Sequence, residues 1–421
     1  MTRKQVLAGL LAAGCLFGSG FSAAASEGGT EGRTASGAPS VFTDREEGIP
    51  AAVLLKEDDS VWAVDAPAGA PEVKGKGAVL MDITTGTLLF EQDAHARVPI
   101  ASVTKIMTLL LVMEAIDDGL LSLSDTLTCS PVAASMGGSQ IWLEPGEQMT
   151  VDDLLKAAAV VSANDACAML AEQIAGSIEG FVARMNTRAD ELGMKDTNFL
   201  DCSGLNDEAY SCAYDVALMS CALMRDHPEI SRYTTIWMDT LRGGKSQLVN
   251  TNKLVRHYAG ATGLKTGTTS AAGHNLSATA TRDGVSLCAV MLGSPTTNDR
   301  FGGCRKLLDY GFANYTCVTP KTDTAALTPI PVRRGTESAV GVTADPLPPL
   351  LLKKGQEKAL VQSVTLAEDL EAPVEKGQTV GELTVTLDGK TLAAVPIRAE
   401  AAVPRLTFFR AFTRLLTALA A

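Results

Sequence analysis

The chain has 421 residues, of which 46% are apolar and 20% charged, and its formal net charge is −12. At about 150 residues per domain, this length predicts two or three folded units, and the composition is that of a globular protein. The acidic balance argues against a nucleic-acid-binding protein, which would need a basic face. With four histidines and no CxxC pair, a structural zinc site is not expected either.

The first 25 residues have the pattern of an export signal. Arg3 and Lys4 precede an apolar stretch over residues 6–21, which is followed by an A-x-A cleavage pattern. We therefore expect residues 1–25 to be a signal peptide. A lipoprotein signal with its lipid on Cys15 is the alternative. Since no later stretch has 18 uninterrupted apolar residues, no internal membrane span is expected.

After residue 25, the amino-acid composition indicates a polar segment followed by a folded unit. Residues 26–75 are rich in glycine, serine, alanine and acidic residues and are expected to form a flexible N-terminal segment. From Gly77 the pattern changes to that of one mixed α+β unit. A hairpin is expected over residues 78–91 with its turn at Gly86. Helices are expected over residues 106–116, 151–175 (interrupted near Ser162), 178–192, 214–224 and 305–312, and strands over 263–293.

Between residues 320 and 349, six prolines separate short runs rich in valine, leucine and threonine. Apolar and polar residues alternate over 382–387 before the turn Asp388-Gly389. This pattern predicts a small all-β domain over residues 318–400 that follows a main domain over 76–317.

The C-terminal residues 401–421 have the pattern of an amphipathic helix. At 100° per residue one face is apolar and Arg410 and Arg414 lie opposite, and no acidic residue follows Glu400. The apolar face consists of Phe408, Phe409, Phe412, Leu415, Leu416 and Leu419. A basic amphipathic tail on an acidic protein predicts a helix that lies on an anionic membrane surface. The alternative is a helix that packs on the protein's own body or on a partner.

Eight cysteines remain if Cys15 leaves with the signal. Outside the cytoplasm this even number permits disulfides, and buried free thiols are the alternative. The spacing does not decide between them.

Three short motifs carry candidate chemistry. Ser102-Val103-Thr104-Lys105 opens the long apolar helix, and its i, i+3 spacing places hydroxyl and amine on one face. A serine needs a base to become a nucleophile, and a lysine can be that base if burial or a nearby cation lowers its pKa. Because Ser102 lies in the first helical turn, its own N–H can face an oxyanion.

The other two motifs would bind substrate and move a proton. In Ser162-Ala163-Asn164, the hydroxyl can relay a proton and the amide can hold a carbonyl group. In Lys265-Thr266-Gly267, ammonium and hydroxyl can bind a carboxylate, and the glycine lets a substrate approach the strand. A Lys265 close to Lys105 would also help to keep Lys105 neutral.

The order S-x-x-K, S-x-N, K-T-G matches the motif set of penicillin-binding proteins and class A β-lactamases. Beyond the motifs, residues 76–315 resemble the low-molecular-mass penicillin-binding proteins of the D-alanyl-D-alanine carboxypeptidase family. The similar runs are PIASVTKIMT (99–108), VSANDA (161–166), LGMKDTNF (192–199), TNKL (251–254), GLKTGT (263–268) and VMLG (290–293). The small β domain and the amphipathic tail are similar to this family's C-terminal stalk and anchor.

The resemblance implies an exported serine peptidase that removes the terminal D-Ala from peptidoglycan stem peptides ending in D-Ala-D-Ala. It would act at the outer face of the cytoplasmic membrane, be acylated by β-lactams, and use no metal or organic cofactor.

By position, Ser102 would be the nucleophile, Lys105 its base and Ser162 the proton relay. Asn164, Lys265, Thr266 and Gly267 would bind substrate, and Arg300 would also contact the terminal carboxylate. The N–H groups of Ser102 and Thr268 would form the oxyanion hole.

Two other chemistries fit the sequence less well. A Ser-His-Asp hydrolase would need a triad motif, and none surrounds the four histidines. A class A β-lactamase would need a glutamate that activates the deacylating water, but the surroundings of Glu191 are those of the carboxypeptidases, and Ala163 replaces the aspartate of S-D-N. An endopeptidase with the same residues, or an idle cell-wall-binding module, remains open.

Overall fold

The structure, a computed structural model, describes residues 69–420. The predictions of a signal peptide over residues 1–25 and of a lipid on Cys15 lie outside the described residues, as does most of the segment 26–75. Within the described part, no helix is both long and apolar enough to cross a membrane.

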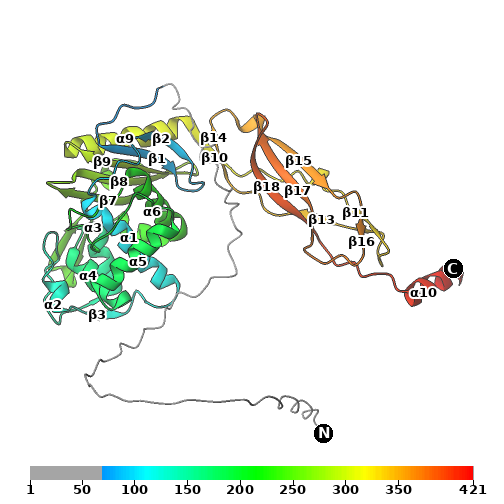
Figure 1. Ribbon diagram of the computed structural model, residues 1–421, viewed down its shortest axis with the longest axis horizontal. Coiled ribbons are helices and arrows are strands. Elements are labelled where there is room, and N and C mark those ends of the chain that lie inside the picture. Colours follow the sequence, from blue (N-terminus) through cyan, green and yellow to red (C-terminus); the bar gives the residue numbers. More distant parts are fainter. Residues whose placement is uncertain (1–68, 421) are drawn as a thin grey trace, which may run out of the picture. The chain divides into compact units, whose positions relative to one another are not determined.

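A five-stranded sheet forms the centre of the main domain (Figure 1). All its neighbouring strands are antiparallel, in the order β2-β1-β9-β8-β7. The strands are β1 (Gly77–Asp82), β2 (Leu88–Gln92), β7 (Ala261–Thr269), β8 (Gly273–Arg282) and β9 (Val285–Ser294). The predicted hairpin around Gly86 and the predicted strands over residues 263–293 are confirmed.

Helices cover both faces of this sheet, α9 on one face and α6 on the other (Figure 1). The helices of the main domain are η1 (Ala101–Thr104), α1 (Lys105–Asp117), α2 (Pro131–Ala134), α3 (Val151–Val160), α4 (Asn164–Ala175), α5 (Ile178–Glu191), α6 (Ala213–Asp226), η2 (Pro228–Ile230), α7 (Ser231–Thr234), α8 (Leu254–His257) and α9 (Thr297–Asn314). Two short hairpins, β3 (Thr126–Thr128) with β4 (Gln148–Thr150), and β5 (Met238–Leu241) with β6 (Ser246–Val249), lie among them, together with η3 (Arg242–Gly244).

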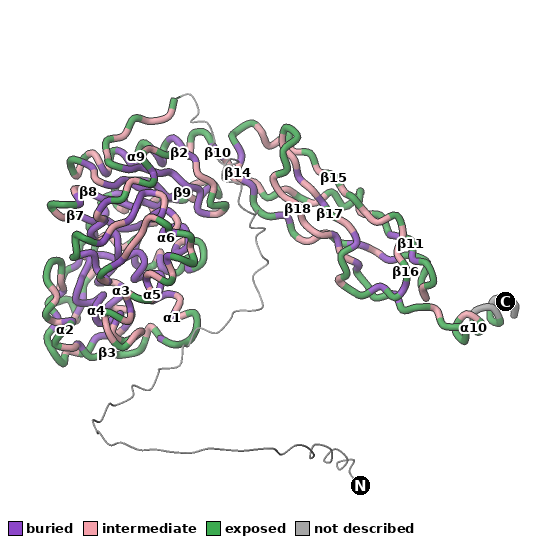
Figure 2. Tube along the Cα trace, in the orientation of Figure 1, coloured by how far each residue is buried: buried purple, intermediate pink, exposed green. Residues whose placement is uncertain are grey.

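The alternation of side chains along a strand separates two cores. On β1, Val79 and Met81 face the core that the sheet shares with α1, α3, α4 and α6, whereas Ala78 and Leu80 face the core beneath α9. Helix α1 lies in the first core, where ten of its thirteen residues are buried (Figure 2). Because α1 carries Lys105 at its first position, the lysine of the first motif lies inside this core.

The predicted helices are present, and one prediction was too short. Helix α9 begins at Thr297 rather than at Arg305, with the Thr296 side chain accepting the Asp299 N–H as its N-cap. The glycines at 302 and 303 weakened the helical pattern in the sequence. At Gly303 a Cβ atom would lie 2.8 Å from the Met291 side chain, so close packing on β9 accounts for this glycine.

The C-terminal domain is all β, as predicted, but its first strand begins slightly earlier. Strand β10 starts at Tyr315 and pairs with β14. Its strands are β10 (Tyr315–Val318), β11 (Ile330–Arg333), β12 (Ala339–Val340), β13 (Val342–Ala344), β14 (Leu350–Lys353), β15 (Val361–Leu366), β16 (Leu370–Glu371), β17 (Thr379–Leu387) and β18 (Lys390–Ala399), with short turns η4 (Thr324–Ala326) and η5 (Glu357–Ala359). The largest sheet has the order β13-β18-β17-β15, and the domain has a core of its own that includes Leu383, Val385 and Ile397.

Helix α10 (Phe408–Ala420) follows the β domain, inside the range predicted to be helical. The eight described cysteines are free thiols, and all but Cys317 are buried. In the described part of the chain, the buried-thiol alternative therefore applies.

Candidate active site

The first motif brings a serine hydroxyl to a buried amine. Ser102 lies in η1 and Lys105 opens α1, so the turn between them places both side chains on one side. Lys105 Nζ lies 2.9 Å from Ser102 Oγ and donates to the carbonyl oxygen of Ser203 at 2.6 Å. The amine is thus held between the hydroxyl and a carbonyl group of a distant loop.

Burial sets the protonation of this amine. Lys105 is completely buried, and this burial lowers its pKa, against the opposing effect of Cys167, Cys202, Asp201 and Asp165. A lysine with a lowered pKa has a larger neutral fraction and can accept the serine proton.

Lys265 is also completely buried, and its pKa is lowered first by burial and second by the positive charge of Lys105. The positive charges of the two lysines repel each other, and burial is the largest cause of the lowered pKa of each amine.

The second motif lies in the turn between α3 and α4. Ser162 has a φ of 65° and is buried, and its Oγ has no hydrogen-bond partner within the described part of the chain. Asn164, the first residue of α4, donates from Nδ2 to Gly137 O at 2.6 Å, whereas its buried Oδ1 lacks a partner among the described residues. A buried polar atom without a partner is costly, so both oxygens are suited to bonds with a bound substrate.

The third motif lies on β7 directly against η1. A Cβ atom on Gly267 would lie 2.6 Å from Ile100 O and 3.0 Å from Ser102 N. Only glycine allows this approach, and it places the strand beside the N–H of Ser102. Lys265 Nζ donates to Thr266 O at 3.1 Å, and Thr266 Oγ1 donates to Thr251 Oγ1 at 2.7 Å.

Arg300 reaches the same strand from α9. Its Nη1 donates to Thr268 Oγ1 at 2.9 Å and to the carbonyl oxygens of Gly267 and Asn275 at 3.2 Å each. The side chain is buried, and Nε has no partner in the part that the structure describes. Arg300 therefore lies at the end of the third motif.

Further contacts connect the three motifs. Thr251 N donates to Val160 O at the end of α3, and Thr251 Oγ1 accepts from Thr266, so Thr251 connects the third motif to the helix that precedes the second. Beside Asn164, a Cβ atom on Gly138 would lie 2.8 Å from Asn164 Nδ2 and 3.2 Å from Leu205 Cδ2. Gly204, the residue before Leu205, packs on the backbone of η1. Through Leu205 and Gly204, the loop beside Asn164 is therefore connected to the first motif.

Sequence analysis missed the residues that hold this arrangement. The buried carboxylate of Asp165 accepts the N–H groups of Ile141 and Leu143 at about 3.1 Å, which fixes the loop that contacts Asn164. The loop that begins at Asp201 supplies the carbonyl group for Lys105. Both aspartates lie in or near runs that resemble the family, but their partners are backbone groups, which a motif does not show.

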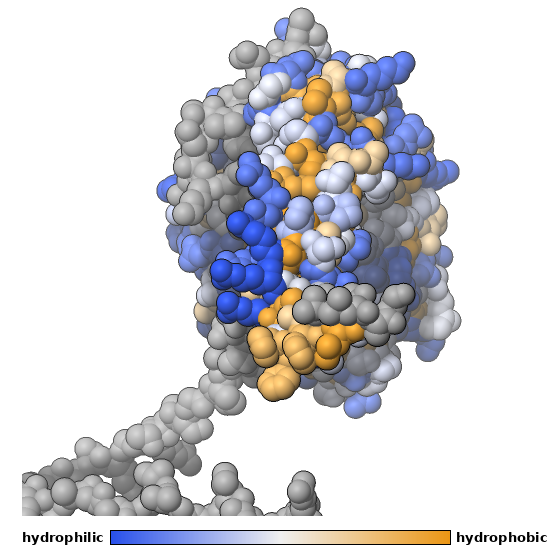
Figure 3. All heavy atoms as spheres, turned by 90° about the vertical axis from the view of Figure 1, so that its right-hand side faces the viewer, coloured by the Kyte–Doolittle hydropathy of each residue, from blue (hydrophilic) through white to orange (hydrophobic). Residues whose placement is uncertain are grey.

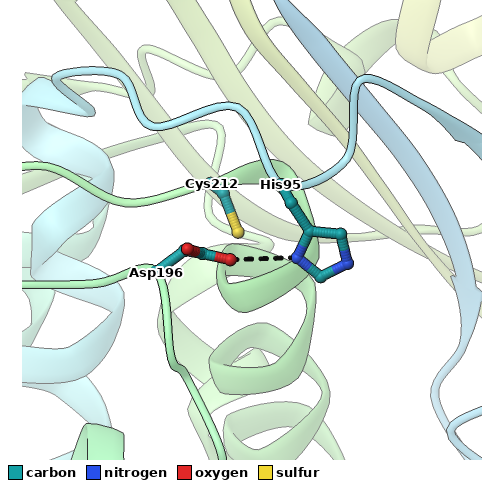
Figure 4. Close-up of side chains that lie close together, drawn as sticks. All are labelled: His95, Asp196 and Cys212. Atoms are coloured by element: carbon teal, nitrogen blue, oxygen red, sulfur yellow. Dashed lines mark hydrogen bonds and ion pairs between the residues drawn. The ribbon is translucent and has the colours of Figure 1, made fainter. Parts of the chain in front are cut away.

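A second cluster of titratable side chains lies apart from the three motifs. His95, Asp196 and Cys212 each have one potential ligand atom within 4.8 Å of the others (Figure 4). Their atoms already have partners: His95 Nδ1 and Arg97 Nε each lie 3.0 Å from the Asp196 carboxylate, and Cys212 Sγ accepts the Asp215 N–H as the N-cap of α6. Through these contacts, the cluster connects the loops that carry His95 and Asp196 to the start of α6.

Comparisons with known proteins agree with the geometry. The family model described as D-alanyl-D-alanine carboxypeptidase matches residues 64–296, and the model described as penicillin-binding protein 5, C-terminal domain, matches residues 315–405.

A curated relative, D-alanyl-D-alanine carboxypeptidase DacF of Bacillus subtilis, is 40% identical over 78% of this chain and 85% of its own length. Penicillin-binding protein 5 of Haemophilus influenzae is similar in structure, with a TM-score of 0.69, 32% identity, and coverage of 80% of this chain and 99% of that chain. Penicillin-binding protein D2 of Listeria monocytogenes in its ampicillin-bound form gives a TM-score of 0.53 and 33% identity over 57% of this chain and all of that chain. With three motifs in one site and a family model that matches more than half of its length, the chain belongs to the D-alanyl-D-alanine carboxypeptidase family, whose members are serine-type hydrolases of peptidoglycan.

Proposed function

We propose that Ser102 is the nucleophile and Lys105 the general base of this carboxypeptidase. The observation that carries the proposal is the 2.9 Å separation of a buried lysine amine from the serine hydroxyl. In the first step, neutral Lys105 takes the proton of Ser102, and Oγ attacks the carbonyl carbon of the penultimate D-Ala. The C–N bond to the terminal D-Ala then breaks and leaves an acyl-enzyme, which water hydrolyses.

The other roles follow from the groups around Ser102. Ser162, with its unpartnered buried hydroxyl, would pass a proton to the leaving amine. Asn164 would hold the stem peptide through its amide. The Ser102 N–H lies beside β7, which supports an oxyanion hole formed with the N–H of Thr268. A β-lactam would acylate Ser102 by the same attack, and the ampicillin-bound form of the similar Listeria protein supports binding of this class of drug.

The charges at the end of the third motif support recognition of a free C-terminal carboxylate. Lys265, Thr266 and Arg300 place two cations and a hydroxyl along one stretch of β7. A carboxylate there would be bound by charge-assisted hydrogen bonds and would favour the protonated form of Lys265.

A substrate pair tests this recognition. We expect a peptide ending in D-Ala-D-Ala to be hydrolysed about 100-fold faster, as kcat/KM, than the same peptide with a C-terminal amide, because the amide leaves buried cations without a charged partner. The preference should shrink in Arg300→Gln and be unchanged in Arg305→Gln, which alters an exposed arginine on the same helix. Equal rates for both peptides would contradict the assignment.

We further propose that the protein is exported and held at the membrane surface by its C-terminal helix. Four large apolar side chains of α10 (Phe408, Phe409, Phe412 and Leu416) are exposed, as is Arg410. Figure 3 shows apolar side chains gathered together at α10. Exposed aromatic and aliphatic side chains beside a basic residue are typical of helices that lie in a lipid interface.

Truncation after Ala402 tests the anchor. We expect the full-length protein to sediment with vesicles that contain anionic lipid, and the truncated protein to remain in the supernatant, because it loses the apolar side chains of α10. Vesicles of neutral lipid alone should bind the full-length protein more weakly. If the truncated protein still sedimented, the anchor would lie elsewhere, and a lipid on Cys15 would become the better explanation.

A further inference from the structure

The second partner of the Lys105 amine comes from a loop that no motif contains. The carbonyl oxygen of Ser203 accepts from Lys105 Nζ at 2.6 Å, a shorter distance than that to Ser102 Oγ. Ser203 is completely buried. The position of the amine relative to the nucleophile therefore depends on what fixes the peptide group between Ser203 and Gly204.

The carboxylate of Asp201 fixes this peptide group from its other side. Asp201 Oδ1 accepts from the Ser203 N–H at 2.6 Å, from the Ser203 hydroxyl at 3.3 Å and from the Gly204 N–H. Its Oδ2 accepts from the Asn206 N–H at 2.7 Å. The Gly204 N–H and the Ser203 carbonyl belong to one planar peptide unit, so Asp201 and Lys105 bind its opposite ends.

The same peptide unit also packs against the backbone of the nucleophile. Gly204 has a φ of +83°, and a Cβ atom there would overlap the carbonyl group of Ala101 and lie 2.9 Å from Ser102 N. The preceding carbonyl oxygen, of Cys202, accepts from Thr108 Oγ1 on α1 at 2.6 Å. The loop is thus bound both to the helix of the base and to the turn of the nucleophile.

We propose that Asp201 is a positioning residue for the acylation step. By binding the Ser203–Gly204 peptide, its carboxylate holds the Lys105 amine at the Ser102 hydroxyl. This inference rests on the proposed roles of Ser102 and Lys105. Asp201 touches neither the reacting atoms nor the amine itself, so its action passes through the Ser203 carbonyl.

The charge of Asp201 adds a second, separable effect. The groups that face Lys105 are Asp201 and Cys202 from this loop, Asp165 and Cys167 from α4, and Lys265 from β7. The negative charge of Asp201 favours the protonated amine and so opposes the lowering of the Lys105 pKa by burial. Removing that charge while keeping a hydrogen-bond acceptor should therefore make Lys105 neutral at lower pH.

Two substitutions separate position from charge. In Asp201→Asn, the amide oxygen can still accept from the N–H groups of Ser203 and Gly204, but the charge is lost. We expect this variant to keep the limiting acylation rate constant within about three-fold and to reach it at lower pH. Asp201→Ala removes the hydrogen bonds that hold the Ser203–Gly204 peptide unit. Its limiting acylation rate constant should fall by about 10- to 100-fold, because catalysis depends on the alignment of the reacting groups.

The experiment is the pH dependence of acylation by a fluorescent penicillin, with thermal unfolding recorded for each variant. Asp125→Asn is the matched control, because this exposed aspartate also accepts a loop N–H, that of Ser122 at 2.8 Å, and belongs to none of the three motifs. It should behave as wild type. No acylation of the wild-type protein would count against the proposed function itself.

A folded Asp201→Ala with the wild-type limiting rate constant would overturn the positioning role, and an Asp201→Asn whose pH profile is not shifted would overturn the charge effect. If Asp201→Ala does not fold, the limiting rate constant of Asp201→Asn decides, because a fall of more than about three-fold in a variant that keeps the hydrogen-bond acceptor would contradict the positioning role.

Discussion

Ser102→Ala is expected to reduce the release of D-Ala from a D-Ala-D-Ala peptide by about 10⁴-fold or more, and to abolish covalent labelling by a fluorescent penicillin. The reason is that the acyl-enzyme needs Oγ, and no other serine hydroxyl lies within hydrogen-bond distance of the Lys105 amine in the described part of the chain. Both measurements use the same purified protein, the first by detection of free D-Ala and the second by fluorescence after gel electrophoresis.

Ser124→Ala is the matched control for this experiment, because it removes an exposed serine hydroxyl of the same domain. This variant should keep the wild-type rates. The nucleophile assignment would fail if Ser102→Ala were labelled like the wild type, or if both variants lost activity to the same extent.

Lys105→Met is expected to reduce the acylation rate constant by about 10²- to 10⁴-fold, the range that a general base contributes. Methionine has a similar length and suits a fully buried position, so the variant is expected to fold. In the wild type the base acts only when it is neutral. Because burial lowers the pKa of Lys105, the acylation rate should rise with pH and reach half of its limit below pH 10.5, the ordinary lysine value.

The pH profile distinguishes loss of the base from loss of structure. In Lys105→Met, the acylation rate should be low and should no longer rise with pH. In Lys195→Met, which alters an exposed lysine, the acylation rate and its rise with pH should be those of the wild type. If the acylation rate of Lys105→Met and its rise with pH were those of the wild type, another group would accept the Ser102 proton.

The sequence was sufficient to predict the central sheet and the long helices of the main domain, but not its short hairpins β3–β4 and β5–β6. The pattern of α1 was clear because the helix is buried on nearly every side, and that of β7 to β9 because they are central strands. Ser102 and Lys105 could be paired from spacing alone, since residues three apart in a helical turn share a face.

What the sequence could not show is contact between distant segments. The partner of Lys105 at Ser203 is 98 residues away, and Thr251 connects the third motif to the helix that precedes the second through one backbone and one side-chain bond. Asp201 acts on N–H groups, which every residue except proline carries, so no pattern of residue types marks its partners. The early start of α9 was hidden because Gly302 and Gly303 are poor helix formers outside this packing.

Mass analysis of the protein after incubation with benzylpenicillin, followed by peptide mapping, tests the central claim most directly. We expect a stable increase in mass equal to one benzylpenicillin, located on the peptide that contains Ser102. An adduct on a different peptide would contradict the assignment of the nucleophile. No adduct with rapid loss of the drug would indicate a β-lactamase, and no adduct with no loss of the drug would contradict the catalytic roles proposed for all three motifs.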